Sequence, residues 1–351
     1  MSTLRYILPR VFLVLAILFA LNWVYEKYFW WDDLETHADV LNNLRKVEQE
    51  ADMLYLAESS NSDSPLDDPD KRSIHEFAAS YYPELKFRVV EKGALHARIY
   101  AALIENLSKE SSIQTVVVTM NLRSFSADWI HSDLESFLSK VELMMAPRPP
   151  LVNRFLLTVR HYQRLSEKER WAVIHEKWKN EKIKWPYDFE YDNIYDWDRG
   201  MAEKGWYDES GEWDQEQVQL GTQFIKNFGF QIDAKSNPRV KDFDRIVELC
   251  EERGYNLVFN LLAENSEGMH RLLGKELLYL LRQNRDFLKN RYEKNGVIVV
   301  DNLEAVPEKE FSDKLFPTEH YAHEGRKTIG RNLALRLRTF YSDKFVEQAQ
   351  E

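Results

Sequence analysis

The sequence is poor in cysteine, because Cys250 is the only one in 351 residues. A single thiol can form no internal disulfide and cannot build a zinc site from several thiolates. The nine histidines are scattered without metal-ligand spacing, so we expect neither a metal nor another cofactor. Cys250 shares an expected helix face with Ile246 and Val247, which favours a small apolar packing residue over a nucleophile.

The chain also lacks an excess of basic side chains. Lysine and arginine number 47 against 58 aspartates and glutamates, which gives a net charge of −11 and a pI near 5.5. Nucleic-acid binding needs a clustered basic face to neutralise phosphates. Nucleic acid is therefore not an expected partner, whereas an apolar content of 44% is enough for a sizeable core.

Charge is missing altogether from residues 11–25, and the flanking residues 6–8 and 28–31 bring this run close to the roughly 20 residues that cross a bilayer. Arg5 and Arg10 precede the run, whereas acidic residues dominate after it, so the N-terminus is predicted to stay in the cytoplasm. Residues 1–31 are interpreted as an uncleaved membrane anchor, with the main domain extracytoplasmic, in the periplasm or at the cell surface. A cleaved signal peptide and a buried core helix are the alternatives, although residues 21–23 offer no A-x-A-like cleavage site.

Beyond the anchor, short β-rich runs alternate with longer runs of helical periodicity. The strands are expected at Met53–Ala57, Phe87–Val90, Thr115–Met120, Asn256–Leu262 and Val297–Val300. The helices are expected at Ile74–Tyr82, Ala94–Leu107, Arg239–Arg253, Gly268–Tyr292 and Gly325–Tyr341. Apolar strands that are each followed by a helix predict an α/β domain with a doubly wound, flavodoxin-like parallel sheet of about five strands.

Residues 126–235 interrupt this alternation and hold seven of the ten tryptophans. We interpret them as an insertion between the third and fourth strands, with a helical first half and an irregular, acidic and aromatic second half. It divides the sheet domain into residues 32–125 and 236–345. The aromatic side chains are expected to give the insertion a small core of its own, and the alternative is a lid or platform that stacks on a sugar.

Polar residues and glycine follow the first three expected strands. Ser59 lies in a strand-to-helix turn, where its hydroxyl can face a substrate and its N–H can point at a developing oxyanion. Gly93 opens the helix after the second strand with an unpaired N–H, and the side-chain amide of Asn121 follows the third. Because the carboxyl ends of parallel strands meet at one edge, these donors predict an oxyanion hole.

A histidine near the C-terminus supplies the general base that a serine hydroxyl requires. His320 precedes the last expected helix, and His323 is the alternative one helical turn away. Taken singly, the serine, glycine and asparagine each have a structural explanation as a cap or turn residue. Their joint order favours a catalytic site.

At these residues the chain resembles the SGNH/GDSL hydrolase superfamily, which is named for serine, glycine, asparagine and histidine in that order. Ser59, Gly93, Asn121 and His320 match the four blocks, and Gly325 lies five residues after the histidine as in the family. The resemblance covers roughly residues 53–125 and 237–340. It implies a catalytic Ser59 and His320, with Gly93 and Asn121 in the oxyanion hole.

The sequence departs from the family pattern before Ser59, around Asn121 and before His320. In particular, Pro317 stands where the family has the aspartate of its triad. Glu319 or Asp313 then orients the histidine, or the enzyme works as a Ser–His dyad. Glu264 and Asn265 follow the fourth strand at the same edge, where they either contact substrate or cap the next helix.

Among membrane-anchored members, the resemblance is closest to D-alanyl-lipoteichoic acid transfer proteins and alginate O-acetyltransferases. It implies an acyl-enzyme on Ser59, an acyl donor, an envelope glycan or lipid substrate, and a polytopic membrane-bound O-acyltransferase as partner. The sequence-based hypothesis is an envelope-polymer O-acyltransferase. The alternatives are a carbohydrate or lipid esterase and a catalytically degenerate scaffold.

Overall fold

The fold is built on one five-stranded parallel sheet. The computed structural model describes residues 2–162 and 165–348. Its strands are β1 (Met53–Ala57), β2 (Phe87–Glu91), β3 (Thr115–Met120), β4 (Asn256–Leu261) and β5 (Ile298–Asp301), in the order β2-β1-β3-β4-β5. This is the flavodoxin-like strand order, so the predicted fold class is confirmed.

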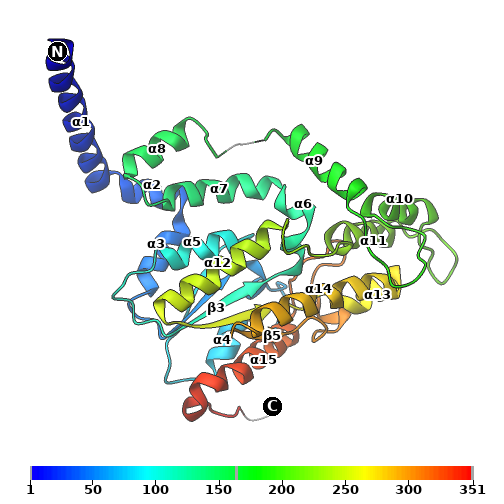
Figure 1. The fold of residues 1–351 in the computed structure, drawn as a ribbon. Coiled ribbons are helices and arrows are strands. Elements are labelled where there is room, and N and C mark those ends of the chain that lie inside the picture. Colours follow the sequence, from blue (N-terminus) through cyan, green and yellow to red (C-terminus); the bar gives the residue numbers. More distant parts are fainter. Residues whose placement is uncertain (1, 163–164, 349–351) are drawn as a thin grey trace.

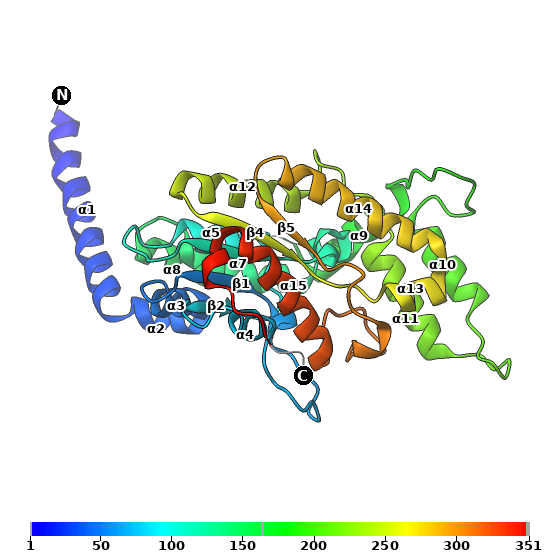
Figure 2. The same ribbon diagram turned by 90° about the horizontal axis from the view of Figure 1, so that it is seen from below.

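Helices cover both faces of the sheet because successive strand residues point to opposite sides. Leu54 and Leu56 join one apolar cluster, whereas Met53 and Tyr55 join the other. The first face packs against α5 (Ala97–Glu105), α12 (Pro238–Arg253) and α14 (Lys275–Glu293). The second packs against α4 (Ile74–Ala79) and α15 (His323–Tyr341), which Figure 2 shows lying across the sheet on the side opposite α12.

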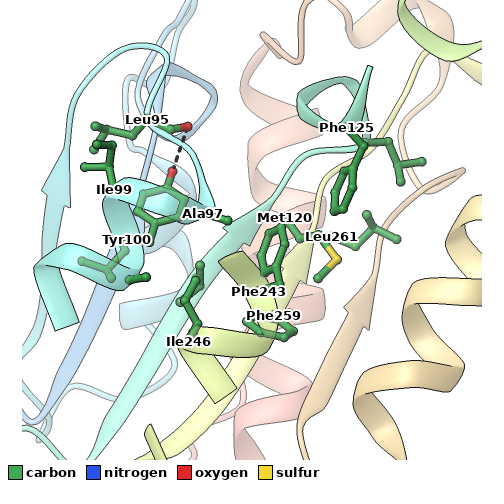
Figure 3. Packing of buried hydrophobic residues seen from close by; sticks show 14 of the residues in the cluster. Leu95, Ala97, Ile99, Tyr100, Met120, Phe125, Phe243, Ile246, Phe259 and Leu261 are labelled. Carbon is green, nitrogen blue, oxygen red and sulfur yellow. Dashed lines mark hydrogen bonds between the residues drawn. The ribbon is translucent and has the colours of Figure 1, made fainter. Parts of the chain in front are cut away.

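Aromatic stacking fixes α12 on the first face, directly beneath the ends of β3 and β4 (Figure 3). The Phe243 ring lies parallel to that of Phe125 at 5.6 Å and edge-on to that of Phe259 at 5.1 Å. Such ring pairs add about 0.5–1.5 kcal/mol to the burial of their area. The segment that carries Asn121 therefore packs on these stacked aromatic rings.

Three helix predictions are wrong in their boundaries. The helix expected over Ile74–Tyr82 already ends at Ala79. The stretch Gly268–Tyr292 forms two helices, α13 (Ser266–Leu273) and α14, because Gly274 between them adopts a φ of +74° that ends the first. The helix expected from Ala94 begins only at Ala97, since Ala94 itself has a φ of +64°. Gly93 therefore lies in a turn and does not open the helix.

The insertion contains α6 (Ala127–Ile130), α7 (Asp133–Met145), α8 (Pro150–Thr158), α9 (Glu167–Asn180), α10 (Ile194–Lys204) and α11 (Gln215–Phe228). Its second half is thus less irregular than expected, because α10 is a capped helix that begins at Asn193. The expected separate core is also wrong. Trp178 and Trp197 belong to the same buried cluster as one face of the sheet, so the insertion extends the main core.

The N-terminal segment forms α1 (Ser2–Tyr28), followed by α2 (Trp30–His37) and α3 (Asp39–Val47). Figure 1 shows α1 projecting away from the domain, and its apolar window is not buried in the protein. The alternative of a buried core helix is therefore wrong. By length and composition, Arg5–Tyr28 is able to cross a membrane.

Candidate active site

The site forms where β1 and β3 end, which is the switch point of the strand order. Each strand leads into a short turn of helix, η1 (Ser59–Asn61) after β1 and η2 (Leu122–Phe125) after β3. Ser59 begins the first turn, and Asn121 is the residue that precedes the second. The two elements therefore bring Ser59 and Asn121 to one edge of the sheet.

A chain of side-chain contacts joins Ser59 to a carboxylate through His320. The Oγ of Ser59 lies 3.0 Å from His320 Nε2, and His320 Nδ1 lies 3.1 Å from Asp313 Oδ2. The hydroxyl of Thr318 donates to the same carboxylate oxygen of Asp313. With a proton on Nδ1 held by Asp313, the imidazole presents its Nε2 lone pair to the serine hydroxyl, which is the arrangement of a Ser–His–Asp triad.

The loop between η3 (Glu308–Glu310) and α15 explains how Asp313 reaches the histidine without the usual spacing. Phe311 and Tyr321 form an isolated antiparallel bridge, and Ser312 N donates to His320 O at 3.0 Å. The loop thus folds back on itself, so that residues seven positions apart lie side by side. Of the two carboxylates expected as the third member, the structure brings Asp313 to the ring.

Glu319 is engaged elsewhere, although it is next to His320 in the sequence. Its side chain is 1% exposed and accepts a hydrogen bond from Arg123 at 2.5 Å. The Arg123 guanidinium also lies over the ring of Trp129, 4.6 Å from its centroid. Arg123 therefore ties the segment after β3 to both the histidine loop and the insertion.

Three acidic side chains, Glu58, Glu264 and Glu319, are buried together beneath the site. Burial, followed by the charges of Glu319 and Glu58, raises the pKa of Glu264 well above its usual range, against the opposing charge of Arg123. Burial also raises the pKa of Glu319, although Arg123 opposes this effect. Because Arg123 contacts Glu319 directly, Glu264 is the member of the pair that retains the proton.

The expected oxyanion donors have different surroundings. Asn121 is 8% exposed, and its Nδ2 lies 3.5 Å from Glu58 Oε1, while the other oxygen of Glu58 lies 3.4 Å from Ser59 Oγ. One carboxylate therefore spans Ser59 and Asn121. Gly93 is exposed in the turn after β2, and a Cβ added there would meet no atom within 4 Å, so the space above it is open.

Asp63 is a residue near the reacting groups that the sequence did not indicate. Its Oδ2 lies 3.2 Å from His320 Nε2, the nitrogen that Ser59 also contacts. Asp63 and Ser59 therefore contact the same nitrogen, the one that must accept the proton of the serine hydroxyl. The only sequence signal was an aspartate four residues after the serine, in a run typical of a polar turn.

The loop that carries Asp63 is held by a buried arginine of α15. Arg326 is fully buried and donates to the backbone oxygens of Arg72 at 2.9 Å and of Asp70 at 2.6 Å, while pairing with Asp68 at 2.9 Å. His323 contacts the same Asp68 carboxylate at 3.1 Å. The alternative histidine thus belongs to this structural network.

Glu264 and Asn265, which follow β4, have different roles. Asn265 caps α13, since its Oδ1 accepts from Gly268 N at 2.9 Å, as the capping interpretation expects. Glu264 is 2% exposed and lies in the buried acidic cluster, where it offers no surface for direct contact with a substrate. Across residues 2–162 and 165–348, no group of three His, Cys, Asp or Glu side chains is arranged to hold a metal ion.

Comparison with known proteins gives structural neighbours only. No family model and no curated protein matches the chain. A member of the lipolytic G-D-S-L family from Veillonella parvula is 9% identical, covering 83% of this chain and 97% of its own, with a TM-score of 0.35. An acetylxylan esterase from Geobacillus stearothermophilus is 10% identical, covering 83% and 96%, with a TM-score of 0.37. Values of this size carry no functional argument, so the residues of the site must supply it.

Proposed function

We propose that this protein is a serine acyl-transfer enzyme that works on esters through an acyl-enzyme on Ser59. The observation that carries the proposal is the contact chain from Ser59 Oγ through His320 to Asp313, at 3.0 and 3.1 Å. Such a chain turns an inert hydroxyl into a nucleophile, because the imidazole accepts its proton while the carboxylate holds the ring. The same contacts argue against a degenerate scaffold.

In the first half of the reaction, Ser59 Oγ attacks the ester carbonyl carbon and its proton passes to His320 Nε2. The resulting oxyanion accepts hydrogen bonds from the Ser59 N–H, with the Asn121 amide and the Gly93 N–H as further donors. Collapse of the tetrahedral intermediate breaks the bond to the leaving alkoxide, which takes the proton from His320. The acyl group then remains on Ser59 as an ester.

In the second half, an acceptor hydroxyl gives its proton to His320 and attacks the acyl carbon. Collapse of this second tetrahedral intermediate breaks the bond to Ser59 Oγ, which takes the proton back from His320. We assign a hydroxyl of an envelope polymer, such as a glycan, as this acceptor, with an acyl donor delivered at the membrane by a polytopic O-acyltransferase. The apolar helix α1 supports this assignment, since it would hold the site beside a bilayer with the main domain outside the cytoplasm. Water is the second candidate acceptor, which makes the protein an esterase, and the partly exposed Ser59 favours it.

The test uses the purified full-length chain in detergent with a chromogenic acetyl ester. Wild type should hydrolyse the ester, and Ser59→Ala should lose at least about 10⁴-fold in turnover. Added oligosaccharide should divert the acetyl group from water to a sugar hydroxyl, measured as acetylated product by mass spectrometry. Ester turnover without diversion would leave the esterase, and equal turnover by Ser59→Ala would exclude both.

A further inference from the structure

One segment of this acidic protein is basic and apolar. Residues 143–166 contain four arginines and no aspartate or glutamate, although the whole chain carries a net charge of −11. The segment includes α8 and the residues on either side of it. Within α8 the basic residue is Arg154, and Arg148 and Arg160 flank the helix. Basic residues beside an apolar face are typical of segments that lie in a membrane interface.

The apolar residues of α8 divide into a buried and an exposed set. Leu157 is buried, and Asn153 ties the helix to the end of α7 by donating to Met144 O at 3.3 Å and Ala146 O at 3.0 Å. The exposed set, called here the α8 stripe, follows helical spacing on the opposite side. It consists of Val152 and Phe155 in α8 and of Val159, the residue that follows the helix, which are 42%, 63% and 55% exposed.

The helix α8 lies beside the C-terminal end of α1 (Figure 1). Leu151 N, at the start of α8, donates to Asn22 Oδ1 of α1 at 3.0 Å. Arg154 Nε lies 3.2 Å from Asp33 Oδ2, and the same carboxylate accepts a hydrogen bond from the Tyr25 hydroxyl. These contacts fix α8 against the part of α1 where the apolar run ends.

The position of Asn22 along α1 indicates how deep α8 would lie in a bilayer that α1 crosses. Asn22 precedes the end of the apolar helix at Tyr28 by six residues, which is about 9 Å of helix. Exposed aromatic side chains mark the stretch from this level to the start of α2, as they do at the interface of a bilayer: Trp23, Tyr28, Phe29 and Trp31. A bilayer crossed by α1 would therefore have its headgroup layer at α8.

We infer that the α8 stripe inserts into the outer interfacial layer of the bilayer that α1 crosses, with anionic phospholipid headgroups as its ligand. Arg148 and Arg160 are exposed on either side of the stripe, and neither forms an ion pair with a residue that the structure describes. The inference rests on the proposed anchoring by α1.

A second membrane contact has a consequence for the active site. A single crossing helix leaves the domain free to rotate about the helix axis, whereas α8 adds a second point of attachment. From α8, the chain packs onto α7, and the preceding α6 carries Trp129 against Arg123. The membrane contact is thus connected to the segment that follows Asn121, and it gives the site one fixed orientation toward the lipid surface.

The experiment places an environment-sensitive fluorophore on single introduced cysteines of the full-length protein in lipid nanodiscs. The sites are Phe155→Cys in the stripe, Leu15→Cys in α1, and Leu335→Cys on α15, which is exposed and remote from α1. Cys250 is buried and remains unlabelled under native conditions. Lipids that carry a doxyl quencher near the top of the acyl chain report contact with the bilayer.

We expect quenching at Leu15 and Phe155 but not at Leu335, with the Phe155 signal stronger when phosphatidylglycerol replaces part of the phosphatidylcholine. Arg148→Gln with Arg160→Gln should return the Phe155 signal to its level in phosphatidylcholine alone. Quenching at Leu15 without quenching at Phe155 would overturn the inference and leave the anchor intact. This is also the result expected if a protein partner, and not lipid, covers the α8 stripe. Absence of quenching at Leu15 would overturn both, whereas ester turnover by Ser59 would not depend on either result.

Discussion

The acidic side chains around His320 occupy two regions with opposite surroundings. In the outer region, Asp313 and Asp63 are 39% and 59% exposed and contact the imidazole nitrogens. In the inner region, Glu264 and Glu319 are buried and share the single cation of Arg123. The outer carboxylates contact the histidine directly, whereas the inner ones affect stability and the position of the loop. Adjacency to His320 in the sequence therefore does not predict which carboxylate contacts the imidazole and which is buried beside Arg123.

The largest expected effect is a loss of ester turnover on substitution in the outer region, which a substitution in the inner region should not cause. Asp313→Asn should lower turnover of the acetyl ester by on the order of 10⁴-fold, because an amide favours the wrong tautomer of the histidine. Its melting temperature should stay near that of wild type, since the side chain is partly exposed. Steady-state kinetics and thermal unfolding measure the two quantities.

The matched control is Glu319→Gln in the inner region. It should keep turnover within about tenfold of wild type and lower the melting temperature, because it weakens the buried contact with Arg123. If Glu319→Gln lost turnover as Asp313→Asn does, or if Asp313→Asn were fully active, the assignment of the two regions would be reversed.

The next effect concerns the inner cation. Arg123→Met should lower the free energy of unfolding by about 3–5 kcal/mol, since it leaves Glu319 buried without a charge partner. The double variant Arg123→Met with Glu319→Leu should recover part of this loss. Arg331→Met, at an exposed position of α15, is the control and should change stability by less than about 0.5 kcal/mol. Denaturant unfolding followed by circular dichroism gives the values, and equal losses for both arginines would contradict the ion-pair argument.

The smallest effect is a pH dependence of stability that originates in Glu264. Burial raises the pKa of this carboxyl in the folded protein above its value in the unfolded chain. Below about pH 4 the carboxyl is protonated in both states and costs no stability. As the pH rises toward the folded pKa, the unfolded chain releases the proton before the folded protein does, so the free energy of unfolding falls. Glu264→Gln should therefore be close to wild type in stability near pH 5 and more stable than wild type at pH 8. The exposed Glu84→Gln should show no such trend. A constant difference across this pH range would mean that Glu264 is ionised throughout.

Much of the fold could be predicted because local patterns and burial agree. The apolar runs at β1 and β3 gave the strand bounds without error, since both strands are buried on both faces. The errors arose where backbone conformation decides the outcome. Gly274 and Ala94 both adopt a positive φ, and the helical periodicity around them contains no sign of it.

The site could be predicted only in part. Ser59, Asn121 and His320 could be proposed from the sequence because each follows or precedes a regular element, in an order that resembles a known family. Asp313 was one of two open choices, because only the folded loop shows that it faces the imidazole. The contacts of Asp63 with His320 and of Arg123 with Glu319 join residues far apart in sequence, and no local pattern signals them.

The central claim is that Ser59 carries the acyl group. The most direct test is brief incubation of the full-length protein with the chromogenic acetyl ester, acid quenching, and peptide mass spectrometry. One acetyl group should be found on the peptide that contains Ser59, with a matching burst of leaving group, and both should vanish in Ser59→Ala. Ester turnover that continues in Ser59→Ala, or an acetyl group on another residue, would contradict the claim.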